Sequence, residues 1–167
     1  MSHDLNASSA RSVAPAIGIR DQPPPGAESI DWDTLVDTAR AAQKRAHAPY
    51  SDFHVGAALL LDDGRVIEGC NVENRSFGLC ICAERLAVAR AIADAPADAR
   101  PQLVALVVIT HASPPGMPCG MCLETLTEFA RDLPILTTNH EDVRRFWTLR
   151  QLHPVPFEWS EKGEDSA

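Results

Sequence analysis

Three cysteines in two short segments constrain the fold of this chain more than any other feature. The segments are Cys82-Ala-Glu-Arg85 and Pro118-Cys-Gly-Met-Cys122. Three thiolates can bind one zinc ion and leave its fourth tetrahedral position open, which is typical of a catalytic rather than a structural site. Two segments that are distant in the sequence must then meet at one point. The predicted metal ligands are Cys82, Cys119 and Cys122, and Glu84 is predicted to move protons beside the metal.

The spacing of these residues also predicts where their helices begin. Each residue of a helix turns by ~100°, so Cys82 and Glu84 would lie about 200° apart inside one. Cys82 is therefore predicted at the very start of a helix. Cys119 and Cys122, three residues apart, share one face of another helix start. Two helix N-termini should converge, and Arg85 is predicted to reach the sulfurs and withdraw electron density from them.

The rest of the pattern predicts an α/β fold, a three-layer α-β-α sandwich with a mixed sheet of about five strands. The apolar run 57–61 lacks alternation, which predicts a strand covered on both faces. The segment 82–94 is apolar nearly all round, which predicts a central, buried helix. Helices are predicted at 31–46, 82–94, 118–130 and 148–152, and strands at 55–61, 65–70, 103–110 and 134–137.

The two ends of the chain differ from its middle in composition. Residues 1–28 show neither helical nor strand period and contain Pro23-Pro24-Pro25-Gly26. They are predicted to form a disordered or loosely docked arm. The folded domain is predicted over residues 29–160, followed by a flexible tail over 161–167.

Charge and hydropathy limit the classes of partner. The net charge is −8, with 15 Lys and Arg against 23 Asp and Glu, which argues against nucleic-acid binding. No stretch approaches the ~20 apolar residues that cross a bilayer, and no signal peptide is recognised. We therefore expect a cytoplasmic protein with a small-molecule substrate and no membrane partner. Five cysteines cannot all pair, and Cys70 and Cys80 are predicted to be small buried apolar residues.

Other classes of site share part of this pattern. A Cys-x-x-Cys pair alone also occurs in redox proteins and in structural zinc sites. The addition of Cys-Ala-Glu at the head of a second helix favours catalysis. A non-catalytic zinc or redox module remains the alternative from another class.

Four segments together resemble the cytidine deaminase family in their order and spacing. They are 49–58 (PYSDFHVGAA), 69–74 (GCNVEN), 81–85 (ICAER) and 118–122 (PCGMC), and the likeness covers residues 31–157. The resemblance implies zinc-dependent hydrolytic deamination of free cytosine nucleosides, cytidine and deoxycytidine, within pyrimidine salvage. It further implies that zinc hydroxide attacks C4 of the base, while Glu84 carries a proton to N3 and then to the leaving amine.

The resemblance also implies the contacts to substrate. Asn71 and Glu73 correspond to residues that hydrogen-bond the ribose 3′-hydroxyl, and at i and i+2 of an extended segment they point to the same side. Phe157 corresponds to an aromatic that packs over the base from a neighbouring subunit, so a homotetramer with shared active sites is implied. The plain alternatives are an exposed polar strand end and an ordinary core or interface aromatic. The remaining implied substrate-binding residues are Phe53, Phe77 and Ala83.

Four residues depart from the family pattern. Leu123-Glu124 stands where Arg-Gln is common, Phe77 replaces a usual Tyr, and Arg75 replaces a small residue. The altered charge one helical turn from the metal is expected to change a subunit contact. The ending Phe157-Glu-Trp159 also resembles blasticidin-type deaminases. A deaminase of N4-substituted or antibiotic cytosine nucleosides is therefore the alternative among enzymes.

Overall fold

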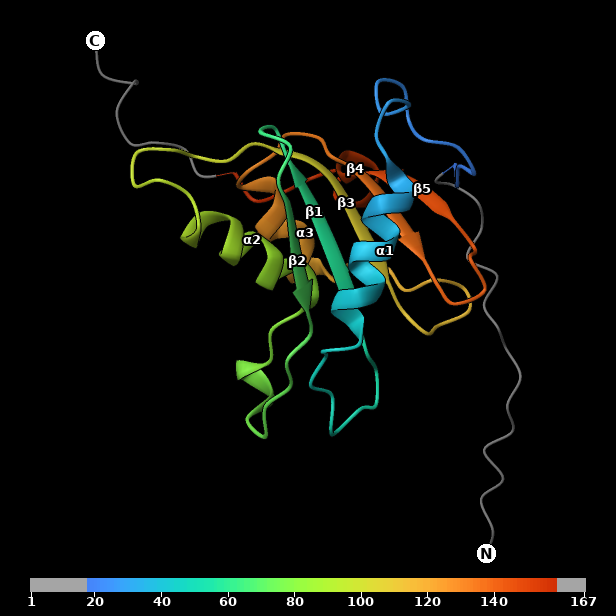
Figure 1. Cartoon of the computed structure of the whole chain (residues 1–167), viewed down its shortest axis with the longest axis vertical. Helices are drawn as coiled ribbons and strands as arrows, with labels where there is room; N and C mark the ends of the chain where they lie inside the picture. Colours follow the sequence, from blue (N-terminus) through green and yellow to red (C-terminus); the bar gives the residue numbers. More distant parts are fainter. Residues whose placement is uncertain (1–17, 159–167) are drawn as a thin grey trace, which may run out of the picture.

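The architecture is a five-stranded sheet with helices on both faces (Figure 1). It was obtained as a computed structural model, and it describes residues 18–158. The strands lie in the order β2-β1-β3-β4-β5, with β3 and β4 parallel and every other neighbouring pair antiparallel. The mixed sheet confirms the predicted class. The strands are β1 (Gly56–Leu61), β2 (Val66–Cys70), β3 (Leu103–Ile109), β4 (Pro134–Thr138) and β5 (Arg145–Thr148).

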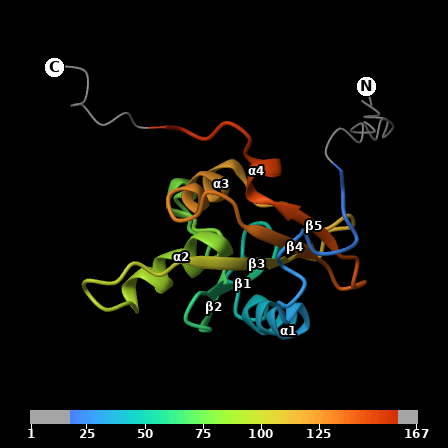
Figure 2. The same ribbon diagram turned by 90° about the horizontal axis from the view of Figure 1, so that it is seen from above.

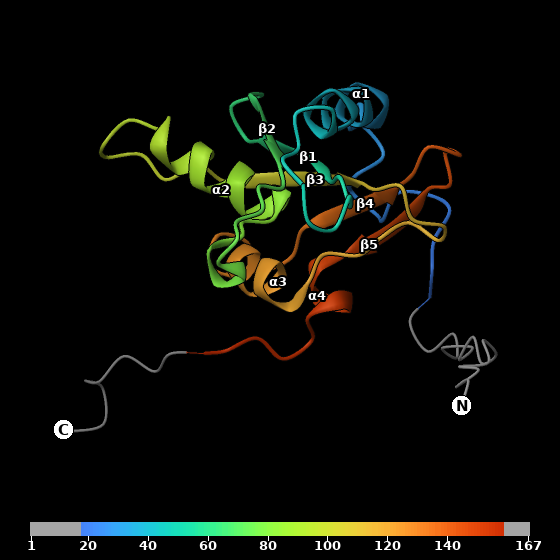
Figure 3. The same ribbon diagram turned by 90° about the horizontal axis from the view of Figure 1, so that it is seen from below.

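The helices divide between the two faces, as Figures 2 and 3 show from opposite sides. One face carries α1 (Trp32–Gln43), and the other carries α2 (Ala83–Ala93) and α3 (Gly120–Thr127). A short helix, α4 (Leu149–Leu152), follows β5, and the 3-10 turn η1 (Phe77–Leu79) precedes α2. No helix within residues 18–158 combines the length and apolar character that a membrane span requires.

Strand β1 lies at the centre of the fold and confirms the prediction of a strand covered on both faces. Ala57 and Leu59 belong to the core under α2 and α3, whereas Ala58 belongs to the core under α1. Successive side chains of a strand point to opposite faces, so a strand between two helical layers must be apolar throughout. The predicted hairpin is also confirmed, and Gly64 turns it with a φ of 84°.

Some predicted boundaries were wrong. Helix α1 ends at Gln43 rather than at 46, because His47 pairs with Val72 and therefore needs extended backbone. Helix α3 ends at Thr127 rather than near 130. Strand β5 was missed, since it has only four residues and its two aromatic side chains belong to opposite cores, which leaves no period to read.

Two predictions of burial were also wrong. Helix α2 is buried along one face only, and Ile92 is exposed on the other. Its alanines made the sequence apolar all round without filling a core on every side. Cys70 and Cys80 are only partly buried, and Cys80 is partnered with Asn74, whose backbone N–H donates to its sulfur at 3.3 Å.

The predicted arm lies mostly outside the described residues, as does the predicted tail over 161–167. Within the part that the structure describes, the chain contacts the domain before α1 begins. The Arg20 carbonyl accepts a hydrogen bond from the Phe146 N–H at 2.8 Å, which adds a bridge to β5. Ala27 is buried, and its carbonyl accepts from the Trp32 indole at 3.1 Å.

The sheet brings three strand ends to one edge. In the strand register, Gly56 at the start of β1 faces both Cys70 at the end of β2 and Ile109 at the end of β3. Strand β4, parallel to β3, ends at the same edge. Helix α2 begins above this edge because β2 has a glycine there: a Cβ on Gly69 would lie 2.1 Å from the Ala83 carbonyl oxygen. The backbone contact therefore fixes the N-terminus of α2 over the end of β2.

Candidate active site

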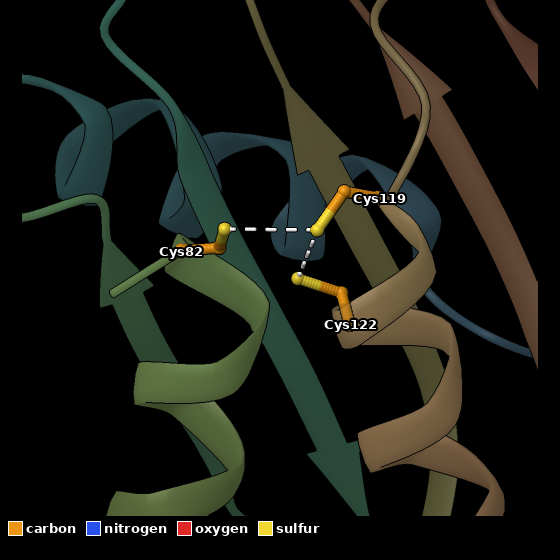
Figure 4. Close-up of side chains that lie close together, drawn as sticks. All are labelled: Cys82, Cys119 and Cys122. Atoms are coloured by element: carbon orange, nitrogen blue, oxygen red, sulfur yellow. Dashed lines mark hydrogen bonds between the residues drawn. The ribbon is translucent and has the colours of Figure 1, made fainter. Parts of the chain in front are cut away.

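The three predicted cysteines meet at two helix N-termini, as predicted (Figure 4). Cys82 is the N-cap residue of α2 and Cys119 that of α3, while Cys122 lies in the first turn of α3. The Cys82 and Cys119 sulfurs are 3.9 Å apart, and those of Cys119 and Cys122 are 3.5 Å apart. Within residues 18–158, they form the one group of three or more His, Cys, Asp or Glu side chains arranged to hold a metal.

The spacing of the sulfurs fits zinc. Zinc–sulfur bonds of about 2.3 Å in a tetrahedron separate the sulfurs by about 3.8 Å. All three sulfurs already lie within 4.8 Å of one another. Neither N-cap cysteine makes a side-chain capping bond. The positive ends of both helix dipoles therefore lie at the cysteines, where they favour negatively charged thiolates.

The thiols of the cluster differ in their pKa values when no metal is bound. Before a metal binds, hydrogen bonding with Cys122 is the main cause that lowers the pKa of Cys82 to about 6, with smaller help from Cys119 and the charge of Arg85. The same contact with Cys82, together with burial, raises the pKa of Cys122. Cys82 therefore loses its proton more readily than Cys122, and all three cysteines would hold zinc as thiolates.

Glu84 lies in the first turn of α2 with only 4% of its surface exposed. Burial is the main cause that raises the pKa of its carboxyl from 4.5 to about 7, and the negative charge of Cys82 adds to the rise. A hydrogen bond from the backbone of Glu84 itself is the main cause that opposes the rise, and contacts with Cys122 and Arg85 oppose it less strongly. A buried carboxyl with a pKa near neutrality can both accept and return a proton, which suits a general acid–base role.

Arg85 lies between the two helices of the site. Its Nη1 is 4.0 Å from the sulfur of Met121, in the first turn of α3. Its charge also lowers the pKa of Cys82. A direct contact between Arg85 and a cysteine sulfur stays a prediction. Met121 was not foreseen as a partner, because nothing in the spacing of Arg85 and Met121 marks them as neighbours.

Asn71 and Glu73 hold the loop between α1 and β1. The Asn71 side chain accepts from the Val55 N–H at 2.8 Å and donates to the Phe53 carbonyl at 2.7 Å. Glu73 accepts from the N–H groups of Tyr50 and Ser51, and also from the Ser51 hydroxyl. These bonds lower the pKa of the Glu73 carboxyl, the Ser51 hydroxyl contributing most. The predicted pair thus fixes a loop, a role that sequence reasoning missed.

The same pair lies beside the cysteine cluster. Val72, between the two, exchanges two backbone hydrogen bonds of 3.0 Å with Ile81. Ile81 directly precedes the ligand Cys82. Strand-like pairing therefore connects the loop that Asn71 and Glu73 hold to the N-terminus of α2.

The predicted apolar contacts lie in two parts of the chain. Ala83 is fully buried at the start of α2, while Phe53 is exposed in the loop that Asn71 holds. Phe77 is 73% exposed and meets Tyr50 edge-on, with ring centroids 5.8 Å apart. Phe157 is 71% exposed on the segment after α4. The first three side chains lie around the loops near Cys82, and Phe157 belongs to a separate part of the chain.

A three-layer α-β-α fold that carries three thiolates and a buried carboxyl at two helix N-termini defines a zinc-dependent enzyme of the hydrolytic class. Residues 31–137 match the family model of the cytidine and deoxycytidylate deaminase zinc-binding region. The chain therefore belongs to the cytidine deaminase family, and zinc is its cofactor.

Individual relatives agree with this assignment. A cytidine deaminase of Halalkalibacterium halodurans is 42% identical over 129 residues, which cover 77% of this chain and 95% of that protein. One from Sporosarcina psychrophila is 35% identical over 77% of this chain and 92% of its own length. The crystal structure of cytidine deaminase from Burkholderia pseudomallei has a TM-score of 0.71 and 41% identity, covering 77% of this chain and all of that one.

Proposed function

We propose that the protein deaminates free cytidine and deoxycytidine hydrolytically, releasing ammonia and the corresponding uridine nucleoside. The observation that carries the proposal is the buried Glu84, with a carboxyl pKa of about 7, in the same helical turn that follows Cys82. A metal site alone would suit a structural role, whereas a proton carrier beside it suits hydrolysis. The activity is assigned to residues 29–160.

The proposed roles follow from the chemistry of each group. Cys82, Cys119 and Cys122 bind zinc, which when bound lowers the pKa of water toward neutrality. Glu84 would accept one proton from the attacking water and deliver it to N3 of the base. It would then take the second proton of that water from the hydroxyl now on C4 and pass it to the leaving amine, so that a C4=O bond replaces the C4–N bond. Its pKa near neutrality lets it perform both transfers without a large energetic cost in either direction. Ammonia leaves as the C4–N bond breaks.

Substrate contacts come from the loops beside Cys82. We assign Asn71 and Glu73 to the ribose hydroxyl, since each carries polar atoms held in place by hydrogen bonds to the 50–55 loop. Phe53 and Ala83 line the base, and Phe77 lies toward the sugar. Because Asn71 and Glu73 are already oriented, little side-chain entropy is lost when a nucleoside binds.

A homotetramer with shared active sites is part of the proposal. Several large apolar side chains are exposed in the single chain, some around the site and others at the far end of α2 and on the segment after α4, and contact with other copies would cover them. They include Phe77, Leu79, Ile92, Met121, Val155 and Phe157. Phe157 is assigned to the base of a nucleoside bound in a neighbouring copy. A cytoplasmic role in pyrimidine salvage is the proposed setting, because free nucleosides are its substrates.

Zinc content and cytidine turnover, measured on wild type and Glu84→Gln, test the mechanism. We expect the variant to retain one zinc per chain and to lose activity by about 10²–10⁴-fold. Full activity of the variant would overturn the role of Glu84. A panel of cytidine, deoxycytidine, N4-substituted cytidines and blasticidin S separates the proposed substrates from the alternative. Arg85→Ala is expected to lower activity more than zinc content, and equal loss of both would contradict its assigned role.

A further inference from the structure

Glu124 connects helix α3 to the segment that follows α4. One carboxylate oxygen, Oε2, accepts a hydrogen bond from His153 Nε2 at 2.7 Å and another from the Phe157 backbone N–H at 3.4 Å. The two donors are four residues apart, so a single oxygen holds both ends of the segment 153–157. Glu124 is also one of the positions at which the chain departs from the family pattern.

The segment between these two contacts has few other means of attachment. Pro154 and Pro156 have no N–H, so Val155 and Phe157 are the backbone donors that follow His153. The segment runs past α3 (Figures 2 and 3). A cavity of about 570 Å³ separates it from α3 and α4, with Thr127 and Leu149 among its lining residues. The segment therefore stands off the domain, and Glu124 spans the gap.

The helical position of Glu124 decides which way the segment faces. Glu124 follows Cys122 by two residues, so its side chain leaves α3 about 200° round the axis from that of Cys122. The segment tied to Glu124 consequently lies on the far side of α3 from the cysteine cluster of the same chain. Val155 and Phe157 are exposed there, Val155 to 83%. An aromatic held in this way is presented outward, away from the cysteines of its own chain.

We propose that Glu124 and His153 are positioning residues that fix the C-terminal segment so that Phe157 can cover the active site of a neighbouring copy. The inference rests on the proposed function, because it assigns a way of setting substrate affinity at that site. A flexible segment would lose conformational entropy each time Phe157 packed over the base. Two hydrogen bonds to one carboxylate hold the segment in advance and reduce that loss.

The test compares KM and kcat for cytidine in wild type, Phe157→Ala, Glu124→Ala and the double variant. Loss of one aromatic contact should raise KM for Phe157→Ala roughly three- to tenfold, with a smaller change in kcat. Glu124→Ala should raise KM in the same direction. Since both changes act through one ring, the double variant should be no worse than Phe157→Ala alone. Zinc content should stay at the wild-type value throughout.

Matched variants separate positioning from simple destabilisation. In Glu124→Gln the amide oxygen can accept both hydrogen bonds, so KM should return to near wild type. Glu128→Ala removes the same charge from the wall of the same cavity and should leave KM unchanged. If Glu124→Ala fails to fold, His153→Ala removes the other partner and should raise KM in the same way.

Two results would overturn the inference: an effect of Glu124→Ala that adds fully to that of Phe157→Ala, or zinc loss in Glu124→Ala. Absence of cytidine turnover in the zinc-loaded wild type is a different result. It would overturn the proposed function itself, so the two failures are distinguishable.

Discussion

Helices α1 and α2 each have a carboxylate two residues after the N-cap, but their N-cap residues and the surroundings of the two carboxylates differ. The N-cap of α1 is Asp31, whose side chain accepts from the Thr34 N–H at 3.1 Å. The N-cap of α2 is Cys82, which makes no side-chain capping bond. Two residues after each N-cap comes a carboxylate: Asp33 is exposed and paired with Arg144, whereas Glu84 is buried.

The difference shows that the start of α1 has stabilising interactions which the start of α2 lacks, because α2 carries residues of the site there. In α1 the cap and the first-turn carboxylate both stabilise the helix, one by a hydrogen bond and the other through the helix dipole. In α2 the cap position holds a metal ligand and the carboxylate gives up its hydration. Helix α3 likewise has a metal ligand, Cys119, at its N-cap, but it has no carboxylate in its first turn. At the site, two helices therefore begin with a cysteine that does not cap the helix but can bind a metal.

The largest expected effect comes from Cys119→Ser. Serine is a preferred N-cap residue but a poor zinc ligand. The change should therefore give α3 a side-chain cap of the kind that α1 has and remove a metal ligand. We expect zinc to be lost and activity to fall by at least about 10³-fold, because the water is no longer activated. Without zinc, the variant should unfold at a temperature equal to or above that of zinc-depleted wild type. Metal analysis and thermal melts check both, with Cys80→Ser as the control that should retain zinc.

The burial of Glu84 predicts a pH dependence of stability in the zinc-depleted protein. Its pKa is about 7 when folded and 4.5 ordinarily, so the folded state binds the proton more tightly than the unfolded chain. Stability is therefore fully present below pH 4.5 and is lost as pH rises through 7. Relative to Glu84→Gln, wild type should lose about 2–3 kcal/mol between pH 5 and 8. Urea unfolding at both pH values measures it, and parallel profiles would contradict the assignment.

Two glycines of the sheet lie directly against the backbone of a helix, Gly69 against α2 and Gly56 against α1. A Cβ on Gly69 would lie 2.1 Å from the Ala83 carbonyl of α2, and one on Gly56 would lie 2.0 Å from the Ala39 carbonyl of α1. Each glycine-to-alanine change should destabilise by about 1–3 kcal/mol, since the helix must shift. Only Gly69→Ala moves the end of α2 that carries Cys82, so only it should also weaken zinc binding. Zinc titration of both variants tests this, and equal weakening would remove the distinction.

The smallest expected effect is that of Asp31→Ala. The variant loses the cap of α1, so its melting temperature should fall by a few degrees. Zinc content and cytidine turnover should not change, because α1 lies on the opposite face of the sheet from the cysteines. Asp37→Ala, a change of the same kind inside α1, is the matched control and should melt near wild type. A loss of zinc in Asp31→Ala would show that the two faces are coupled.

Prediction from the sequence succeeded where the signal was local. The run of apolar residues in β1, the turn at Gly64 and the start of α2 at Cys82 each depend on a few neighbouring residues. It failed at β5, which is short and has a large side chain on each face. It also overestimated the burial of α2, because alanine is compatible with both core and surface.

The sequence by itself determined the chemistry of the centre, since three thiolates, one carboxyl and their positions at helix starts follow from spacing along the chain. Only the tertiary structure decided what surrounds that centre. Glu73 finds Ser51 across 22 residues, and Glu124 finds His153 across 29. Periodicity encodes which face of an element is apolar, but it carries no record of which distant side chain will meet a given polar group. Those pairings arise when the sheet and its two helical layers close. The first orients a loop beside the cysteines, and the second fixes the C-terminal segment against α3.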